Sequence, residues 1–431
     1  MYRAAKPFRG SRGAPVALTA VGLLVQKFGG TSVADPDRIR AVADHLVRTR
    51  RAGSDVVAVV SAMGKTTDDL VRLANDVTRH PGGREMDMLL TSGERISMAL
   101  LSMAVEDLGQ AAVSFTGSQA GILTDTDHGK AKIIEVRGDR IREALAEGKV
   151  AIVAGFQGVS TTRDITTLGR GGSDTTAVAL AAALGADACE IYTDVEGVYT
   201  ADPRIVPSAR KLARVSFDEM LEMAATGGRV LALRSVEFAR NHRVKVHVRS
   251  SFTWAPGTWI TEEDAAMDTT DAMEQAIISG VTHDTGEAKV TIEHVPDRPG
   301  VAAMIFRDLA EAGINVDMIV QNVSSAGHTD ISFTVPRSDV ERAARCMEKI
   351  VIDTEASGFG TDEHIGRVSL IGAGMKTHPG IAAKMFETLA NEGVNIEMIS
   401  TSTIRISCVV AEDDVERAVR SLHAAFELDK E

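Results

Sequence analysis

Aromatic residues and basic charge are both scarce in this chain of 431 residues. Phe, Trp and Tyr make up 4% of it, and 60 acidic against 47 basic side chains leave a net charge of −13. A nucleic-acid-binding surface needs a basic stripe and aromatic rings for base stacking. The composition therefore excludes nucleic acid as the expected partner.

Cysteine and long apolar runs are scarce as well. The three cysteines, Cys189, Cys346 and Cys408, lie far apart and lack the spacing of a metal-ligand set. No uninterrupted run reaches the roughly 20 apolar residues of a membrane span. These absences favour a cytoplasmic protein with no metal site of its own and no membrane partner.

Residues 1–22 hold scattered basic side chains ahead of an apolar run from Val16 to Val25, an arrangement that superficially resembles a secretory signal. The run has no small-residue cleavage site after it and continues into an expected first strand. We therefore expect residues 1–22 to be a disordered extension or the product of an upstream start codon.

From Leu23 to Ser251 short apolar runs alternate with Gly/Ser/Thr turns and helical patterns, as at Val56–Val60 and Val150–Ala154. Near-continuous apolar strands between helices predict a mostly parallel sheet covered on both faces, that is, an α/β domain, which we place at residues 23–265. Ligands of such sheets bind at the carboxyl ends of the strands. The segment Ser251–Asp271 breaks the pattern and predicts a junction out of this domain.

The most informative stretch runs from Thr166 to Thr176 and continues as an alanine-rich helical pattern to Leu184. Its glycines flank Arg170, and Ser173 and Asp174 are good N-cap residues. A glycine loop that opens a helix lets backbone N–H groups converge on an anion, and an arginine there can bind a carboxylate. The stretch therefore predicts an anion site.

This string closely resembles the signature loop of aspartate kinases, members of the amino-acid kinase family. Four further segments match that family in order: Lys27–Ser32, Ser61–Gly64, Glu85–Ser97 and Tyr192–Arg204. The resemblance implies a three-layer αβα domain that transfers the γ-phosphoryl group of ATP, bound with Mg²⁺, to the side-chain carboxylate of L-aspartate. The products would be 4-phospho-L-aspartate and ADP.

The resemblance also implies roles for individual residues. The expected catalytic residues are Lys27, Arg170 and Asp174, with Asp174 holding Lys27 in place. The expected substrate residues are Thr67, Glu94, Phe156, Arg170, Gly171, Gly172 and Ser173. The expected nucleotide residues are Lys27, Gly29, Gly30, Ser61, Ser173, Thr193, Asp194, Tyr199, Arg204 and Arg229. At position 229 the family usually carries lysine, so this nucleotide contact departs from the pattern.

The C-terminal third contains a repeat. From Pro299 onward the chain recurs 80 residues later, from Pro379 through Ile399, without a gap. Each copy predicts a strand, a Pro-Gly turn, an amphipathic helix, an alternating strand and a later second helix. This βαββαβ, ferredoxin-like order resembles the ACT domain, and we expect two, at residues 277–352 and 365–430. They can be interleaved, with the strand near residues 277–281 in the second.

In similar kinases, positions matching these units hold lysine or threonine as feedback effectors of lysine, threonine, methionine and diaminopimelate biosynthesis. The expected effector residues are Asp297, Arg298, Pro299, Gly300, Val301, Ala302, Asn315, Val316, Asp317, Gln321, Asn322, Asn395 and Ile396. We expect a homo-oligomer, or a heterotetramer whose regulatory subunit starts internally at Met267 or Met273.

Two alternatives stay open at this point. One is another member of the amino-acid kinase family that phosphorylates glutamate, acetylglutamate or a nucleoside monophosphate. The other is an amino-acid-sensing protein with ACT domains and an inactive kinase domain, against which the retained Lys27 speaks. A nicotinamide-dependent dehydrogenase is excluded because no Gly-x-Gly-x-x-Gly follows the first strand.

Overall fold

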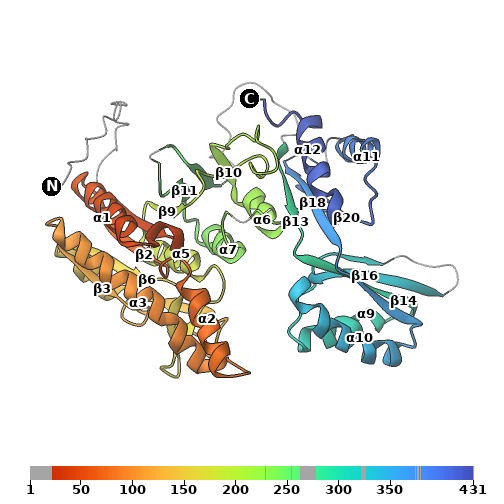
Figure 1. Cartoon of the computed structure of the whole chain (residues 1–431), viewed down its shortest axis with the longest axis horizontal. Helices are drawn as coiled ribbons and strands as arrows, with labels where there is room; N and C mark the ends of the chain where they lie inside the picture. Colours follow the sequence, from red (N-terminus) through yellow and green to blue (C-terminus); the bar gives the residue numbers. More distant parts are fainter. Residues whose placement is uncertain are drawn as a thin grey trace, which may run out of the picture.

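The computed structural model describes residues 22–228, 230–253, 255–262, 278–321, 327–373, 375, 378 and 380–430. The predicted disordered extension, except residue 22, and the predicted site residues Arg229 and Asn322 lie outside these ranges. The N-terminal domain comes first, and two smaller C-terminal units follow it at the blue end of the colour bar (Figure 1).

The N-terminal domain is built on a sheet of eight described strands in the order β10-β12-β11-β9-β1-β2-β6-β3. Strands β3, β6, β2, β1, β9 and β11 are parallel, and β12 is antiparallel to β11. The strands are β1 (Leu23–Phe28), β2 (Asp55–Val60), β3 (Ala112–Phe115), β6 (Val150–Ala154), β9 (Ala188–Thr193), β10 (Arg214–Ser216), β11 (Val246–Ser250) and β12 (Thr258–Thr261). The predicted mostly parallel sheet is confirmed.

Strand β2 shows why this sheet is covered on both faces. Its Val57 and Val59 pack in a core with residues of α4, α5, α6 and α7, whereas Val56 and Val60 pack in another core with α1 and α3. Alternate residues of a strand point to opposite faces, so both faces need apolar side chains. The helices are α1 (Pro36–Arg51), α2 (Thr66–Val77), α3 (Gly83–Asp107), α4 (Asp139–Ala146), α5 (Gly172–Leu184), α6 (Phe217–Ala225) and α7 (Leu233–His242). The three-layer αβα prediction is confirmed.

A small second sheet in this domain has the order β5-β4-β7-β8. Its strands are β4 (Ile122–Thr124), β5 (Ile133–Val136), β7 (Gln157–Ser160) and β8 (Ile165–Thr167). Strand β8 leads directly into the signature loop, so this sheet fixes where that loop begins.

Helix α3 is, among the described helices, the one long and apolar enough to cross a membrane by length and composition. One face of it packs on the domain, because its Leu101 and Val105 share a core with α1 and β2, whereas Ile96, Leu100 and Met103 are exposed. It also carries the buried carboxylate of Glu94. We therefore interpret α3 as a helix of the layer that covers one face of the large sheet.

The first C-terminal unit has the sheet β15-β16-β14-β17, covered by two helices. Its elements are β14 (Glu287–Pro296), α9 (Val301–Glu311), β15 (Ile319–Gln321), β16 (His328–Pro336), α10 (Val340–Thr354) and β17 (Gly358–Asp362). This is the predicted βαββαβ order. Helix α9 ends, as the repeat predicts, just before Gly313, whereas α10 ends at Thr354 with Glu355 in the left-handed conformation.

The second C-terminal unit has the sheet β19-β20-β18-β13, in which β13 takes the place that β17 has in the first unit. Its elements are β13 (Ile278–Asp284), β18 (Ile365–Gly372), α11 (Ile381–Asn391), β19 (Met398–Thr401), β20 (Arg405–Ala411) and α12 (Val415–Ala425). Because β13 precedes the whole first unit in sequence, the two units are interleaved. The predicted division at 277–352 and 365–430 therefore omits β17 from the first sheet, and it assigns β13 to the first unit although β13 belongs to the second sheet.

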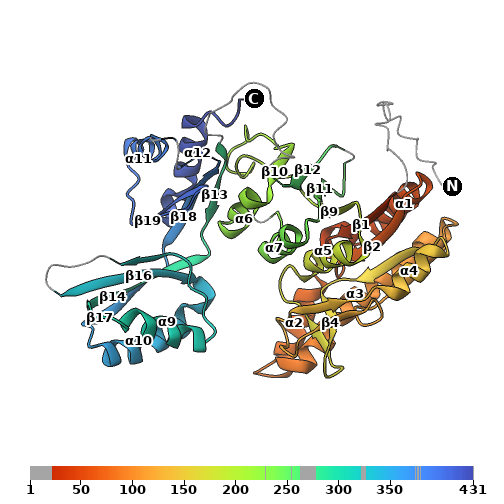
Figure 2. The same cartoon turned by 180° about the vertical axis from the view of Figure 1, so that it is seen from behind.

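The N-terminal domain meets the second unit through α6, which lies beside β13 and β18 in both views (Figures 1 and 2). The interpretation of Ser251–Asp271 as a junction was wrong for its first part. Strand β12 lies inside that segment and pairs with β10 and β11 of the large sheet. Its Ile260 is fully buried in the core, so the domain continues to the end of β12.

Candidate active site

The carboxyl ends of β1, β2 and β6 open onto a cavity of about 330 Å³. All seven predicted substrate residues line it. Four other predicted residues line it as well: Lys27, Gly30, Ser61 and Asp174. Parallel strands place the residues that follow β1, β2 and β6 at one edge of the sheet, and α3 and the loop after β8 supply the rest of the lining.

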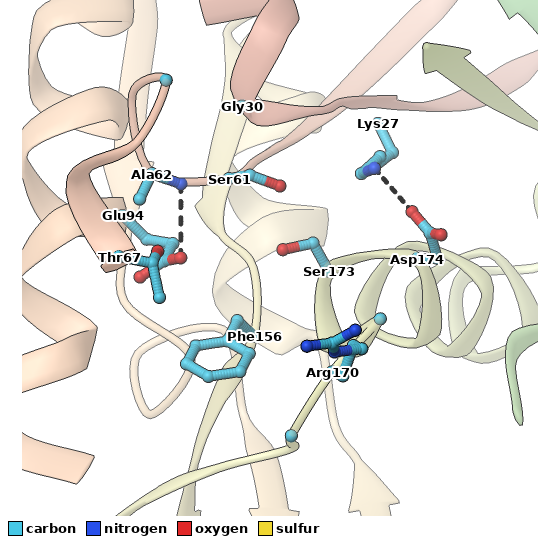
Figure 3. A pocket seen from close by; sticks show the side chains of 14 residues that line it. Lys27, Gly30, Ser61, Ala62, Thr67, Glu94, Phe156, Arg170, Ser173 and Asp174 are labelled. Atoms are coloured by element: carbon cyan, nitrogen blue, oxygen red, sulfur yellow. Dashed lines mark hydrogen bonds and ion pairs between the residues drawn. The ribbon is translucent and has the colours of Figure 1, made fainter. Parts of the chain in front are cut away.

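A lysine–aspartate pair forms one end of this cavity (Figure 3). Lys27 Nζ lies 2.6 Å from Asp174 Oδ1, and each side chain is 12% exposed. Lys27 belongs to β1, whereas Asp174 lies in the first turn of α5, where the helix dipole favours a negative charge. The pair therefore fixes a cation at the edge of the cavity.

The signature loop enters α5 differently from the sequence-based expectation. Ser173 and Asp174 lie inside the first turn, and the N-cap is Gly171, whose φ is 73°. A Cβ added at Gly171 would lie 2.2 Å from the Cβ of Ala232, so both the backbone conformation and the space require glycine. Because the helix begins at Gly172, the side chains of Ser173 and Asp174 do not cap it and instead line the cavity.

Glu94 of α3 is a buried carboxylate at the other end, 3% exposed. The backbone N–H of Ala62 donates to its Oε1 at 3.2 Å, while Oε2 is buried and lacks a hydrogen-bond partner among the described residues. Burial raises the pKa of Glu94 to about 7, against the opposing effect of the backbone hydrogen bonds. A cationic group entering the cavity beside Oε2 would satisfy this oxygen.

Figure 3 shows how the two ends are connected. Glu94 lies near Thr67, Ser173 stands between them and the Lys27–Asp174 pair, and Phe156 and Arg170 lie below. Phe156 has a φ of 68°, which is uncommon for a residue other than glycine and marks a constrained position. Arg170 is exposed, so its guanidinium is available to a ligand.

A second cavity of about 610 Å³ lies beyond the end of β9. Its lining includes four of the predicted nucleotide residues: Thr193, Asp194, Tyr199 and Arg204. The backbone N–H of Gly29 donates to the carbonyl of Tyr192 at 3.3 Å, so the loop after β1 is tied to the end of β9. Of the predicted nucleotide residues that the structure describes, four line each cavity and Gly29 lines neither.

Sequence reasoning missed two residues that hold the signature loop. Asp87, 1% exposed, accepts hydrogen bonds from the hydroxyl of Thr167, the ring of His128 and the N–H of Gly129. Arg234 donates to the carbonyl of Leu168, within the loop, and to that of Ala131, at 2.9 Å each. The signal for Asp87 was its position on α3, seven residues before Glu94 and therefore on the same helix face.

Some residues that line the second cavity were not predicted from the sequence either. Met220 and Met223 come from α6, and Thr282–Thr285 come from β13 and the turn after it. Nothing in the local sequence of β13 indicates a place beside a ligand cavity. The first cavity likewise contains Ala62, Gly64 and Gly169, which were not predicted to bind anything.

The predicted effector residues fall into three places. Residues 297–302 surround the start of α9, where Gly300 is the N-cap with a φ of 96°. Residues 315–317 form the loop before β15, and Gln321 ends that strand. Asn395 and Ile396 precede β19. Met318 and Met398 pack in one cluster, so the loops before β15 and β19 meet between the two units.

Comparison with known proteins agrees with this architecture. A model of the amino acid kinase family matches residues 22–250, and a model of the ACT domain matches residues 290–350 and 368–426. An aspartokinase of Corynebacterium efficiens is 57% identical over 413 residues, covering 95% of this chain and 97% of the relative.

Two solved structures of Escherichia coli aspartokinase III are similar to this chain and cover 94% of it and 99% of theirs. The complex with aspartate and ADP has a TM-score of 0.78 at 26% identity. The complex with lysine and aspartate has a TM-score of 0.71 at 25% identity. From the matching family model and the close relative along almost its whole length, we conclude that the chain belongs to the aspartokinases, within the amino-acid kinase family, and is a phosphotransferase.

Proposed function

We propose that this enzyme transfers the γ-phosphoryl group of ATP to the side-chain carboxylate of L-aspartate, giving 4-phospho-L-aspartate and ADP. The observation that carries the proposal is the first cavity, which joins a buried, half-satisfied carboxylate to a fixed Lys27–Asp174 pair. The cavity is thus suited to a short ligand that has an ammonium group at one end and an anion at the other.

In this proposal aspartate binds between Glu94 and Lys27. Its ammonium group pairs with the free Oε2 of Glu94, and its α-carboxylate pairs with the exposed Arg170. Its side-chain carboxylate then faces Lys27. The free pKa of this carboxylate is about 3.9, so it is ionised at neutral pH and the reaction needs no general base.

Catalysis in this scheme comes from positioning and from stabilisation of charge. Lys27 and the N–H group of Gly30 stabilise the charge on the moving phosphoryl group, while Asp174 keeps Lys27 in place. The N–H of Gly29 already donates to the carbonyl of Tyr192, so it is left out of this role. The nucleotide occupies the second cavity beside Thr193 and Tyr199. The binding of aspartate and ADP by the similar E. coli enzyme supports this assignment.

Mg²⁺ fits this site as an ion carried by the nucleotide. Among the described residues there is no group of three or more His, Cys, Asp or Glu side chains able to hold a metal. Mg²⁺ commonly binds through substrate phosphates and one or two carboxylates, and Asp174 of the first cavity and Asp194 of the second are among the carboxylates that line them. Bound there, the ion would neutralise phosphate charge.

The C-terminal units act, in this proposal, as sensors of lysine, threonine or both, and the enzyme serves the synthesis of lysine, threonine and methionine. The lysine complex of the E. coli relative supports this assignment. We also propose a cytoplasmic oligomer, with or without an internally started regulatory chain. An intact mass of natively expressed chains would reveal a second product that starts at Met267 or Met273.

Trapping of the acyl phosphate with hydroxylamine tests the reaction. The enzyme is given MgATP and either L-aspartate or L-glutamate, each with and without lysine plus threonine. We expect product from aspartate alone, and less of it when the effectors are present. No product from either substrate, together with binding of lysine or threonine, would contradict the catalytic proposal and leave an amino-acid sensor.

A further inference from the structure

Arg367 lies where the three parts of the chain meet. It belongs to β18 of the second unit, and its side chain is 1% exposed. Its guanidinium donates to the carbonyl of Ala225, in the N-terminal domain, at 2.8 Å. It also pairs with two residues of the first unit, with Glu287 at 2.8 Å and with Asp317. One buried cation therefore contacts all three parts.

The hydrogen bond from Arg367 to Ala225 holds the C-terminal end of α6, a helix that lines the second cavity. Ala225 is the last residue of α6, which lines the second cavity together with Gly227 and Gly228. The last carbonyls of a helix lack helical donors, and a cation there is favoured by the helix dipole. Arg367 thus satisfies a carbonyl that the helix leaves open, only two residues before the glycines of the cavity.

The turn after α6 lies in close contact with β13 of the second unit. The hydroxyls of Thr226 and Thr282 are 2.6 Å apart. Gly227 has a φ of 103°, and a Cβ there would lie 1.9 Å from the carbonyl oxygen of His283. With so little space between the two backbones, a shift of β13 or β18 must move the wall of the second cavity.

The ion pair with Asp317 connects Arg367 to the first unit. Asp317 lies in the loop before β15, its side chain is 44% exposed, and it is one of the predicted effector residues. The ammonium group of an amino acid bound there would compete with Arg367 for the same carboxylate. A buried cation that loses a partner is strongly destabilised, so the guanidinium or its strand must adjust.

We propose that Arg367 is a positioning residue for the nucleotide cavity. It holds the end of α6 in the geometry that accepts the nucleotide, and binding of an amino acid at Asp317 weakens this hold. The inference rests on the proposed function, in which the second cavity receives ATP and the loop at Asp317 receives the effector.

A second ion pair on the same helix provides a matched control. Glu222 of α6 pairs with Arg405 of β20 at 3.1 Å and accepts a hydrogen bond from Ser402 at 2.8 Å. Their side chains are 21% and 13% exposed for Glu222 and Arg405. This pair anchors α6 to the second unit alone. Comparing the two pairs therefore shows whether an effect comes from anchoring α6 to the second unit or from the additional contact of Arg367 with the first unit.

The experiment compares two charge-balanced variants of the full chain, R367M/E287Q and R405M/E222Q, because removing both members of a pair leaves no lone buried charge. ADP affinity is measured by calorimetry, followed by kcat, the KM values for ATP and aspartate, and inhibition by lysine plus threonine. We expect R367M/E287Q to weaken ADP binding and raise the KM for ATP about five- to ten-fold, with kcat and the KM for aspartate nearly unchanged.

Inhibition distinguishes the two pairs. R367M/E287Q should need at least about five-fold more lysine plus threonine for half inhibition, whereas R405M/E222Q should keep the wild-type value. Equal losses of inhibition in both variants would overturn the proposal. So would unchanged ADP affinity in R367M/E287Q when the wild-type chain binds ADP. A wild-type chain that fails to bind ADP would overturn the proposed function as well.

The conservative variant R367K provides a second test. It also replaces the double variant if that variant does not fold. Lysine keeps the charge but cannot reach three partners in the fork geometry of arginine. We expect its ADP affinity to lie between those of the wild type and the double variant. A wild-type ADP affinity in folded R367K, checked by circular dichroism, would overturn the positioning role.

Discussion

At the scale of the residue, burial decides the chemistry of Glu94. Its carboxyl group is 3% exposed, and its pKa is raised from 4.5 to about 7. The folded state therefore favours the protonated form. The stability that this group contributes is complete below about pH 4.5 and is lost as the pH rises through 7, because the buried charge then has to form.

The same shift predicts how aspartate affinity depends on pH. Protonated Glu94 cannot pair with an ammonium group, so the KM for aspartate should fall as the pH rises from 6 to 8. In E94Q this change should disappear. At pH 8 the KM of E94Q should be roughly 30-fold higher, since losing one member of a buried charge pair costs about 2 kcal/mol or more. Initial rates at five pH values test this, and a parallel pH profile in both enzymes would contradict it.

Lys27 gives a second prediction at this scale. Because its Nζ is fixed 2.6 Å from Asp174, it is positioned before the substrate arrives. K27M should lower kcat by about 10²- to 10³-fold, the usual effect of removing one group that stabilises transition-state charge. K149M is the control, since the ion pair of Lys149 with Glu147 is exposed. Similar kcat values for K27M and the wild type would rule out this role.

At the scale of the element, the candidate active site depends on how α3 and the signature loop are held together. Asp87 and Glu94 lie on one face of α3, and Asp87 holds both Thr167 and the turn at Gly129. The helix that presents Glu94 thus also fixes the strand that leads into Arg170. A rigid arrangement of this kind keeps the two ends of the cavity at a constant separation.

This arrangement predicts the effect of D87N. The amide is isosteric but uncharged, so the hydrogen bonds from Thr167 and Gly129 should weaken, at a cost of about 1.5 kcal/mol or more for each charged bond lost. We expect a lower thermal unfolding midpoint and a several-fold higher KM for aspartate, with a nearly unchanged KM for ATP. D107N, at the exposed end of α3, is the control. Equal changes in both KM values would point to a general loss of structure instead.

At the scale of the whole molecule, interleaving determines which fragments can fold. The second sheet takes β13 from the sequence before the first unit, and Val281 of β13 is 1% exposed in the core of the second unit. Met267 and Met273 both precede β13, so a chain started at either would contain both C-terminal sheets entirely. A chain that begins after β13 would leave β18 as an open edge.

Two fragments test this. Residues 267–431 should fold and unfold cooperatively, whereas residues 285–431 should aggregate or show a lower unfolding midpoint, because they lack β13 and expose apolar surface of β18. Circular dichroism, thermal unfolding and size-exclusion chromatography provide the comparison. Identical unfolding of the two fragments would show that β13 is dispensable for the second unit.

The sequence by itself determined the layers, the signature loop and the repeat. The apolar runs at Val56–Val60 and Val150–Ala154 coincide closely with β2 and β6, because a strand covered on both faces must be apolar throughout. The glycines around Arg170 predict the loop, since its backbone conformation requires them. All predicted substrate residues lie in one cavity, where segments that follow the parallel strands β2 and β6 meet α3 and the loop after β8.

Only the tertiary structure decided which distant segments meet. The close approach of Ala232 to Gly171, the N-cap of α5, and the pairing of β12 with β10 and β11 in the large sheet are tertiary contacts. The exchange of β13 and β17 between the two sheets, the wall of the second cavity and the partners of Arg367 join residues from separate parts of the chain. Local periodicity and turn chemistry describe short stretches, whereas these contacts arise when complete elements pack together.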